Sequence, residues 1–172
     1  MTKIIITGGA GFIGSNLAKK LLDKNIESLL IIDDLSTGNE SNLTSIINDE
    51  RVEFINSRIE DIENINSLFS SYDVCYHLAA GVGVQYIMDN LSQSLLTNIL
   101  ATHKVLEACQ NNNLPVLLTS TSEVYGVAKD EICTEETKSL IGPTTKLRWS
   151  YAASKMIDEF IALSLFEEGK IQ

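Results

Sequence analysis

The stretch TGGAGFIG, residues 7–14, places four glycines in eight residues where an apolar strand leads into a helix. The preceding run, residues 3–7, is continuous and rich in isoleucine, which is typical of a strand buried on both faces of a parallel sheet. The residues that follow are apolar at helical spacing. The spacing of Gly8, Gly11 and Gly14 lets the turn tighten, a phosphate approach the backbone and the helix pack close to the strand.

A second predicted strand, residues 28–32, ends at Asp33. An acidic residue about 20 positions after a glycine turn can accept hydrogen bonds from the ribose hydroxyls of an adenosine. A tight turn without a ligand is the alternative interpretation of the glycines. The strand, the helix and the acidic residue in this order favour dinucleotide binding.

Strands and helices alternate along the rest of the chain. Further strands are predicted at residues 52–56, 73–78 and 116–119, and helices near 40–49, 62–70, 91–111 and 149–168. This alternation predicts one α/β domain over residues 1–172, a doubly wound parallel sheet of Rossmann type with strand order 3-2-1-4-5. Ligands of such sheets bind at the carboxyl ends of the strands. The segments expected there are residues 7–14, 33–38, 77–83 and 119–125.

Two segments depart from this regular alternation. Residues 125–148 show no clear period, and a loop of this length is expected to be functional. The last helix closes at Gly169, and residues 170–172 have the character of the first step of a sixth strand. We therefore expect the chain to be truncated before that strand, without the strands and substrate subdomain that would follow it.

Bulk composition excludes several classes of partner. A net charge of −10 and a pI near 4.6 argue against nucleic acid, because phosphate binding needs clustered lysine and arginine. No apolar run approaches membrane-spanning length, and Met1 leads into a strand without a signal peptide. The three cysteines are far apart and lack metal-ligand spacing. We expect a cytoplasmic protein that binds neither nucleic acid nor membrane.

The segment YAASK opens the last predicted helix and places Tyr151 and Lys155 on one face, one turn apart. A free tyrosine has a pKa near 10, and a nearby cation lowers that pKa. Tyr151 could then remove a hydroxyl proton while a hydride leaves the same carbon for a cofactor. Such pairs are common on helix surfaces, but downstream of a dinucleotide fingerprint the catalytic interpretation is favoured.

The segment TSTSEVYG, residues 119–126, follows a predicted buried strand and faces the expected crevice. Thr121 is the candidate for a hydrogen bond to the reacting oxygen, and Ser122 and Glu123 are candidates for proton handling. The alternative is that these side chains cap the strand and satisfy loop backbone groups, and for Ser120 the two interpretations are balanced.

Two basic residues complete the set of candidates. Arg148 lies three residues before the tyrosine of YAASK and could contact a substrate phosphate or carboxylate. A surface salt bridge is an almost equally favoured role for it. His77 ends a predicted buried strand and is interpreted as a packed residue rather than a base.

Together these motifs resemble the extended short-chain dehydrogenase/reductases, the NAD-dependent nucleotide-sugar epimerase/dehydratase family. TGGAGFIG resembles its cofactor loop, HLAAG (77–81) its fourth-strand segment, TSTSEVYG its triad hydroxyl segment, and GPTTKLRWSYAASK (142–155) the run into its Tyr/Lys pair. The resemblance implies a triad of Thr121, Tyr151 and Lys155. It also implies cofactor contacts from Gly8, Gly11, Phe12, Ile13, Gly14, Asp33, Leu35, Thr37, Gly38, Asp61, Ile62, Leu78, Ala79, Ala80, Asn98, Ser120, Tyr151 and Lys155. NAD is expected over NADP, because the Asp33 carboxylate would repel a 2′-phosphate.

Within that family the motifs look most like UDP-glucuronate decarboxylases and related bacterial epimerases. The resemblance implies a UDP-sugar substrate, transient oxidation at C4, and then epimerisation, decarboxylation or dehydration with NAD recycled. It also implies a homodimer through the helices near 91–111 and 149–168. The alternative is a non-catalytic dinucleotide-binding module or an inactive remnant, which would have no reason to keep Thr121, Tyr151 and Lys155 together.

Overall fold

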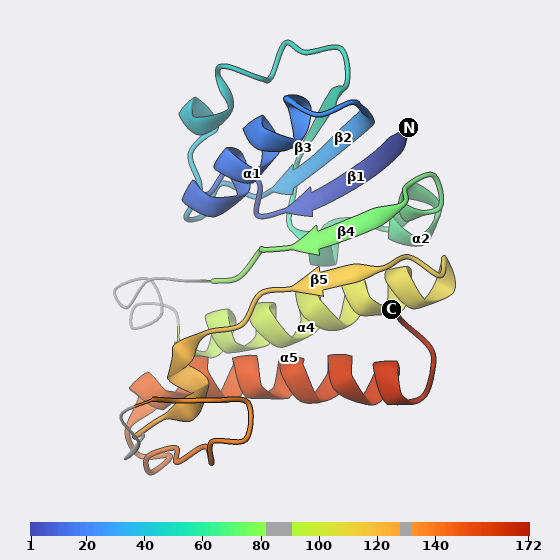
Figure 1. The fold of residues 1–172 in the computed structure, drawn as a ribbon. Helices are drawn as coiled ribbons and strands as arrows, with labels where there is room; N and C mark the ends of the chain where they lie inside the picture. The colour runs from blue at the N-terminus through green and yellow to red at the C-terminus, as the bar shows by residue number, and fades with distance from the viewer. Residues whose placement is uncertain (82–90, 128–131) are drawn as a thin grey trace.

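The structure is a computed structural model that describes residues 1–81, 91–127 and 132–172. Five strands form one parallel sheet in the order β3-β2-β1-β4-β5, which confirms the predicted doubly wound α/β fold. The arrowheads of these strands point to the same edge of the sheet (Figure 1). The strands are β1 (Thr2–Thr7), β2 (Ile26–Asp33), β3 (Val52–Asn56), β4 (Val74–His77) and β5 (Val116–Leu118).

One face of the sheet is covered by α2 (Ile65–Phe69) and α4 (Leu91–Asn111). Ile5 of β1 and Leu30 of β2 point to this face and are fully buried against the helices, together with Val105 of α4. Burying a large aliphatic side chain stabilises the fold by roughly 1.5–3 kcal/mol. This packing holds α4 against the carboxyl end of β4, where the site lies.

The other face is covered by α1 (Phe12–Leu22). Ile4 and Ile6, the neighbours of Ile5 in the chain, point to this face because successive strand residues alternate between faces. They pack with Ala18 of α1 in a second buried cluster. The unbroken isoleucine run of β1 is therefore explained by burial on both sides.

Two predicted helices are much shorter than expected. The segment near 40–49 holds only the 3-10 turn η1 (Glu40–Leu43), and the segment near 62–70 holds only α2 preceded by the 3-10 turn η2 (Ile59–Asp61). In the first segment the side chain of Asn39 accepts a hydrogen bond from the backbone of Ser41. Short polar side chains of this kind compete with helical hydrogen bonds, which explains the irregular backbone.

The last helix, α5 (Ser150–Glu167), packs along α4, and the two run side by side below β5 in Figure 1. Before it come two 3-10 turns, η3 (Ser122–Tyr125) and η4 (Leu147–Trp149). In the predicted long loop, residues 128–131 lie outside the described residues. Gly126, at φ +64°, makes a bridge with Leu140. The chain ends beside β5, where the backbone of Val116 donates to the carbonyl of Gln172 at 3.0 Å.

In residues 1–81, 91–127 and 132–172, no helix has both the length and the apolar character that spanning a membrane demands.

Candidate functional site

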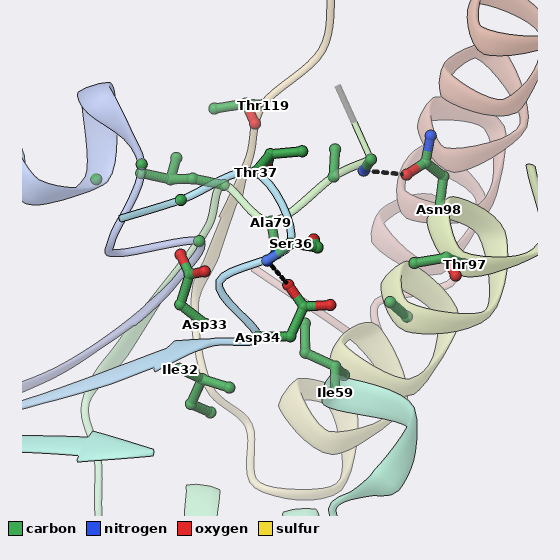
Figure 2. Close-up of a pocket in the computed structure, with 18 of the residues that line it drawn as sticks. Ile32, Asp33, Asp34, Ser36, Thr37, Ile59, Ala79, Thr97, Asn98 and Thr119 are labelled. Atoms are coloured by element: carbon green, nitrogen blue, oxygen red, sulfur yellow. Dashed lines mark hydrogen bonds between the residues drawn. The ribbon is translucent and has the colours of Figure 1, made fainter. Parts of the chain in front are cut away.

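A cavity of about 400 Å³ opens at the carboxyl ends of the strands. It is lined by the segments that follow β1, β2, β3, β4 and β5, and by residues of α4 and α5. Figure 2 shows labelled side chains from α4 and from the segments after β2, β3, β4 and β5 around this space. The predicted segments after β1, β2, β4 and β5 therefore meet, although residues 82 and 83 of the segment after β4 lie outside the described residues.

The glycine turn forms one wall of this cavity. Gly8 has φ +72°, and a Cβ on it would lie 2.7 Å from the backbone nitrogen of Ala79. A Cβ on Gly14 would lie 2.3 Å from the carbonyl oxygen of Gly8. Both distances are impossible for a real side chain. Glycine at position 8 therefore lets the turn contact the segment after β4, and glycine at position 14 lets α1 pack against the turn.

The amino end of α1 faces the cavity and carries no acidic residue of its own. Gly11 is its N-cap residue, no side chain makes a cap hydrogen bond, and its first turn carries no acidic residue. The first amides of a helix have no partner within the helix, and the helix dipole favours negative charge there. Since Phe12, Ile13 and Gly14 line the cavity, this end of α1 suits a phosphate group.

Asp33 ends β2 and is buried at the edge of the cavity. Its two carboxylate oxygens accept hydrogen bonds from the backbone of Ala10 at 2.8 Å and of Leu35 at 2.9 Å. Burial raises the pKa of Asp33, and these two hydrogen bonds work against that rise. Figure 2 shows Asp33 turned toward the glycine turn and the exposed Asp34 turned toward Ile59. Each Asp33 oxygen retains a lone pair for a ligand hydroxyl.

The opposite wall is held by Asn98 of α4. Its side-chain oxygen accepts a hydrogen bond from the backbone of Gly81 at 2.6 Å, and its amide donates to the hydroxyl of Ser154 at 3.3 Å (Figure 2 draws the first). Asn98 therefore ties the segment after β4 to both α4 and α5. Leu78, Ala79 and Ala80 of that segment line the cavity, as predicted for cofactor contacts.

Tyr151 and Lys155 both line the cavity, one turn apart on α5. The Lys155 ammonium lies 3.1 Å from a carboxylate oxygen of Asp158, and both side chains are buried. The expected lowering of the phenol pKa by Lys155 is wrong for this structure. Burial raises the pKa of Tyr151, and the charges of Glu123 and Asp158 raise it further.

His77, at the end of β4, is a packed residue, as predicted. Its Nδ1 lies 2.6 Å from the hydroxyl of Thr7, and its Nε2 lies 3.0 Å from the hydroxyl of Thr102. Burial, together with the charge of Lys155, lowers its pKa to about 3. A neutral imidazole with both nitrogens engaged supports the strand ends and is not free to act as a base.

The hydroxyl segment after β5 divides between the cavity and the turn beside it. Thr119 and Ser120 line the cavity, and the Ser120 hydroxyl donates to the carboxylate of Glu159. Thr121 is the N-cap residue of η3, and its hydroxyl accepts from the backbone of Glu123 at 3.3 Å. Neither Thr121 nor the turn residues Ser122 and Glu123 line the cavity.

Four other predicted site residues lie outside the cavity lining. Leu35 packs on the core beneath α1, Asp61 is exposed, and Ile62 is buried in the core under α4. Arg148 is exposed, with its guanidinium carbon 4.7 Å from the centre of the Trp149 ring. The remaining predicted contacts, Phe12, Ile13, Thr37, Gly38 and Asn98 among them, line the cavity.

Residues 57–60 line the cavity and were missed by the sequence analysis. The Arg58 guanidinium donates to the hydroxyl of Thr97 on α4 at 2.7 Å and to the carboxylate of Glu60 at 3.2 Å. The signal was present in the sequence, because these residues directly follow the predicted strand at 52–56. The strand-end rule applied to that strand would have selected them in place of Asp61 and Ile62.

Comparison with known proteins agrees with this geometry. The family model described as GDP-mannose 4,6 dehydratase matches residues 5–172, which is nearly the whole chain. The chain belongs to this family. Its members among curated relatives include enzymes that act on several nucleotide sugars.

Three relatives illustrate the range of this GDP-mannose 4,6-dehydratase family. UDP-N-acetyl-alpha-D-glucosaminuronate decarboxylase of Bacillus cytotoxicus is 34% identical over 97% of this chain and 51% of its own length. A second relative is the UDP-N-acetylglucosamine 4-epimerase of Methanobrevibacter ruminantium, whose structure is known in complex with UDP-N-acetylmuramic acid. The two folds match with a TM-score of 0.85 and are 32% identical in sequence, and the match covers 96% of this chain and 51% of that one. A third is the dTDP-glucose 4,6-dehydratase of Streptomyces venezuelae, whose structure has NAD and TYD bound. The folds match with a TM-score of 0.85 and are 28% identical in sequence, and the match covers 96% of this chain and 52% of that one.

The chain thus spans about half the length of the relatives that it matches. The matched half carries the sheet, the glycine turn and the Tyr151–Lys155 pair.

Proposed function

We propose that this chain is the NAD-binding and catalytic part of a nucleotide-sugar-modifying enzyme that works through transient oxidation at C4 of the sugar. The observation that carries the proposal is the convergence of four features on one cavity: the glycine turn, Asp33, Tyr151 and Lys155. A dinucleotide needs the first two, and proton abstraction beside its ring needs the last two.

The cavity residues fit NAD part by part. The diphosphate would rest on the amides at the amino end of α1, where the glycine turn lines the cavity. The adenosine ribose would hydrogen-bond with Asp33, whose buried carboxylate would repel the 2′-phosphate of NADP. Residues 57–60 would line the adenine end, and Leu78, Ala79 and Ala80 would support the middle of the cofactor.

The catalytic half of the proposal assigns the proton chemistry to α5. As the phenolate, Tyr151 would accept the proton of the C4 hydroxyl, and Lys155 would bind the cofactor ribose. NAD, when bound, supplies the hydride acceptor and returns the hydride later in the cycle. Thr121, Ser122 and Glu123 would take part in proton transfer, because η3 packs against α5 and Glu123 lies near enough to Tyr151 to raise its pKa.

The substrate proposed is a UDP-sugar, and the outcome at C4 or beyond is epimerisation, decarboxylation or dehydration. The relatives on which this rests act on UDP- and dTDP-linked sugars by their names. Arg148 is kept as a weak candidate for a substrate contact. A cytoplasmic location is also proposed, because Cys75, Cys109 and Cys133 are all free thiols, as is usual in a reducing compartment.

A homodimer through α4 and α5 is also proposed. Large apolar side chains are exposed along the two helices, which is unusual for a face left in water. Phe160, Leu163 and Phe166 of α5 are 67%, 59% and 56% exposed, and Leu96 and Leu100 of α4 are 52% and 54% exposed. A second copy of the same face would cover them, as two helices from each subunit form a four-helix bundle.

Titration calorimetry tests cofactor binding directly. The chain should bind NAD, bind NADP more weakly, and lose this discrimination in Asp33→Asn. Absence of heat with NAD, NADH and NADP on folded material contradicts the proposal. Turnover is then assayed with UDP-glucuronate and UDP-glucose on the longest product of the gene that contains this chain, and carbon dioxide or a C4 epimer is expected. NAD binding without any turnover would favour the alternative, a non-catalytic dinucleotide-binding module.

A further inference from the structure

The ion pair between Lys155 and Asp158 is unusual because both charged side chains are buried. The ammonium nitrogen and the Asp158 Oδ2 oxygen are 3.1 Å apart, and the two side chains are 3% and 0% exposed. The other oxygen, Oδ1, is buried without a hydrogen-bond partner in the described part of the chain. A buried carboxylate with one unpaired oxygen costs stability, so this arrangement is not explained by stability alone.

Asp158 continues a line of buried polar groups that begins at the glycine turn. Thr7 contacts His77, and His77 contacts Thr102. Burial raises the pKa of Asp158, and Lys155 and the Thr102 hydroxyl work against that rise. Since His77 is neutral, Lys155 is the cation that balances Asp158 in this line. The ammonium of Lys155 is therefore held on the side of α5 that faces α4 and β4.

The charged groups around Tyr151 come from two elements. Glu123 approaches from η3, and Asp158 lies two turns away on α5, while Lys155 lies between. Glu159, the neighbour of Asp158, is engaged instead by Ser120. Of the basic groups on adjoining elements, Arg148 lies over Trp149, and His103 of α4 lines a separate hollow with Ile157 and Phe160.

We propose that Asp158 is a positioning residue that holds the Lys155 ammonium and offsets its charge, so that the Tyr151 phenol is harder to ionise in the cofactor-free protein. This inference rests on the proposed function, because it concerns the residue assigned there as the base. Its physical basis is that a compensated ammonium attracts a phenolate less than a bare one does.

Asp158→Asn tests this by ultraviolet difference titration. The absorbance that grows as tyrosine ionises is recorded against pH, and the curve of the matching Tyr151→Phe variant is subtracted to isolate Tyr151. Loss of one charge about two helical turns away should move the Tyr151 midpoint to lower pH by roughly one unit. An unchanged midpoint overturns the proposal.

Two matched variants separate this role from a general effect of charge or packing. Glu159→Gln removes the same charge from the next residue, which is engaged by Ser120 and not by Lys155, and should move the Tyr151 midpoint much less. Asp158→Asn introduced into the Lys155→Met variant should also move the midpoint less than it does in the wild-type chain, because the effect of Asp158 acts through Lys155. A shift of equal size in Glu159→Gln, or an undiminished shift in the Lys155→Met background, contradicts the proposal.

Asp158→Ser provides the same test if Asp158→Asn does not fold, as judged by circular dichroism. The titration needs no cofactor, so its result is independent of the calorimetry above. Failure of NAD binding would overturn the proposed function and leave the titration interpretable. A normal NAD heat with an unchanged Tyr151 midpoint would overturn only the role of Asp158.

Discussion

The buried imidazole of His77 makes the stability of this fold depend on pH. In the folded chain the pKa of His77 is about 3, whereas its ordinary value is 6.5, because burial and the charge of Lys155 disfavour the cation. The unfolded chain therefore binds a proton below about pH 6.5 that the folded chain does not bind until about pH 3. The stabilisation is complete above the unfolded pKa and is lost as the pH falls toward the folded pKa.

The size of the effect follows from these two pKa values. Between pH 7 and pH 5, proton uptake by the unfolded state lowers the free energy of unfolding by about 2 kcal/mol. That is a large part of the stability of an ordinary domain, which is roughly 5–15 kcal/mol. The loss should appear in a range where most aspartates and glutamates are still ionised.

Urea unfolding, followed by circular dichroism at pH 7 and pH 5, measures this loss. His77→Gln is the reference, because it removes the titrating group and keeps one hydrogen bond, to Thr7 or to Thr102. The variant is expected to be less stable than wild type at pH 7, and the gap between them should shrink by about 2 kcal/mol at pH 5. Carboxylates common to both chains cancel in this comparison. A gap that stays constant between the two pH values would refute the reasoning.

Two further predictions concern the glycine turn and the core. Gly14→Ala brings a methyl group to 2.3 Å from the Gly8 carbonyl oxygen and should displace α1. Calorimetry should then show an NAD affinity at least tenfold lower. An unchanged affinity would contradict the proposed position of the diphosphate. Phe69→Ala removes a fully buried ring from the core under α4. In a urea titration the free energy of unfolding should fall by about 3–5 kcal/mol. A loss below about 1 kcal/mol would show that the core closes over the cavity and would contradict this prediction.

Much of the fold could be predicted from the sequence because its signals are local. The isoleucine run of β1, the glycines after it and the helical spacing of α1 lie within about twenty residues of one another. The strand at residues 52–56 and the helix at residues 91–111 were predicted with the bounds that the structure has. The helix expected near 40–49 was wrong because Asn39 and its polar neighbours bond to the backbone locally, a competition that apolar spacing does not reveal.

The site was less predictable than the fold. Its walls follow from one rule, that ligands meet the carboxyl ends of parallel strands, and this rule located the glycine turn, Asp33 and the segment after β4. Which residues of a loop turn inward depends on its path. Here η2 begins three residues after β3, so residues 57–60 line the cavity, while Asp61 faces solvent and Ile62 enters the core.

The sequence by itself determined the order of the elements, the close approach of backbone at Gly8 and Gly14, and the placing of Tyr151 and Lys155 on one helix face. These depend on side-chain size and on spacing along the chain. Only the tertiary structure decided the electrostatics of the site. The pKa of Tyr151 depends on its burial and on Glu123 of η3. Lys155 and Asp158 are three residues apart on one helix, but only tertiary packing buries their ion pair. Electric fields act between groups that folding brings together, and no local pattern in the chain records that distance.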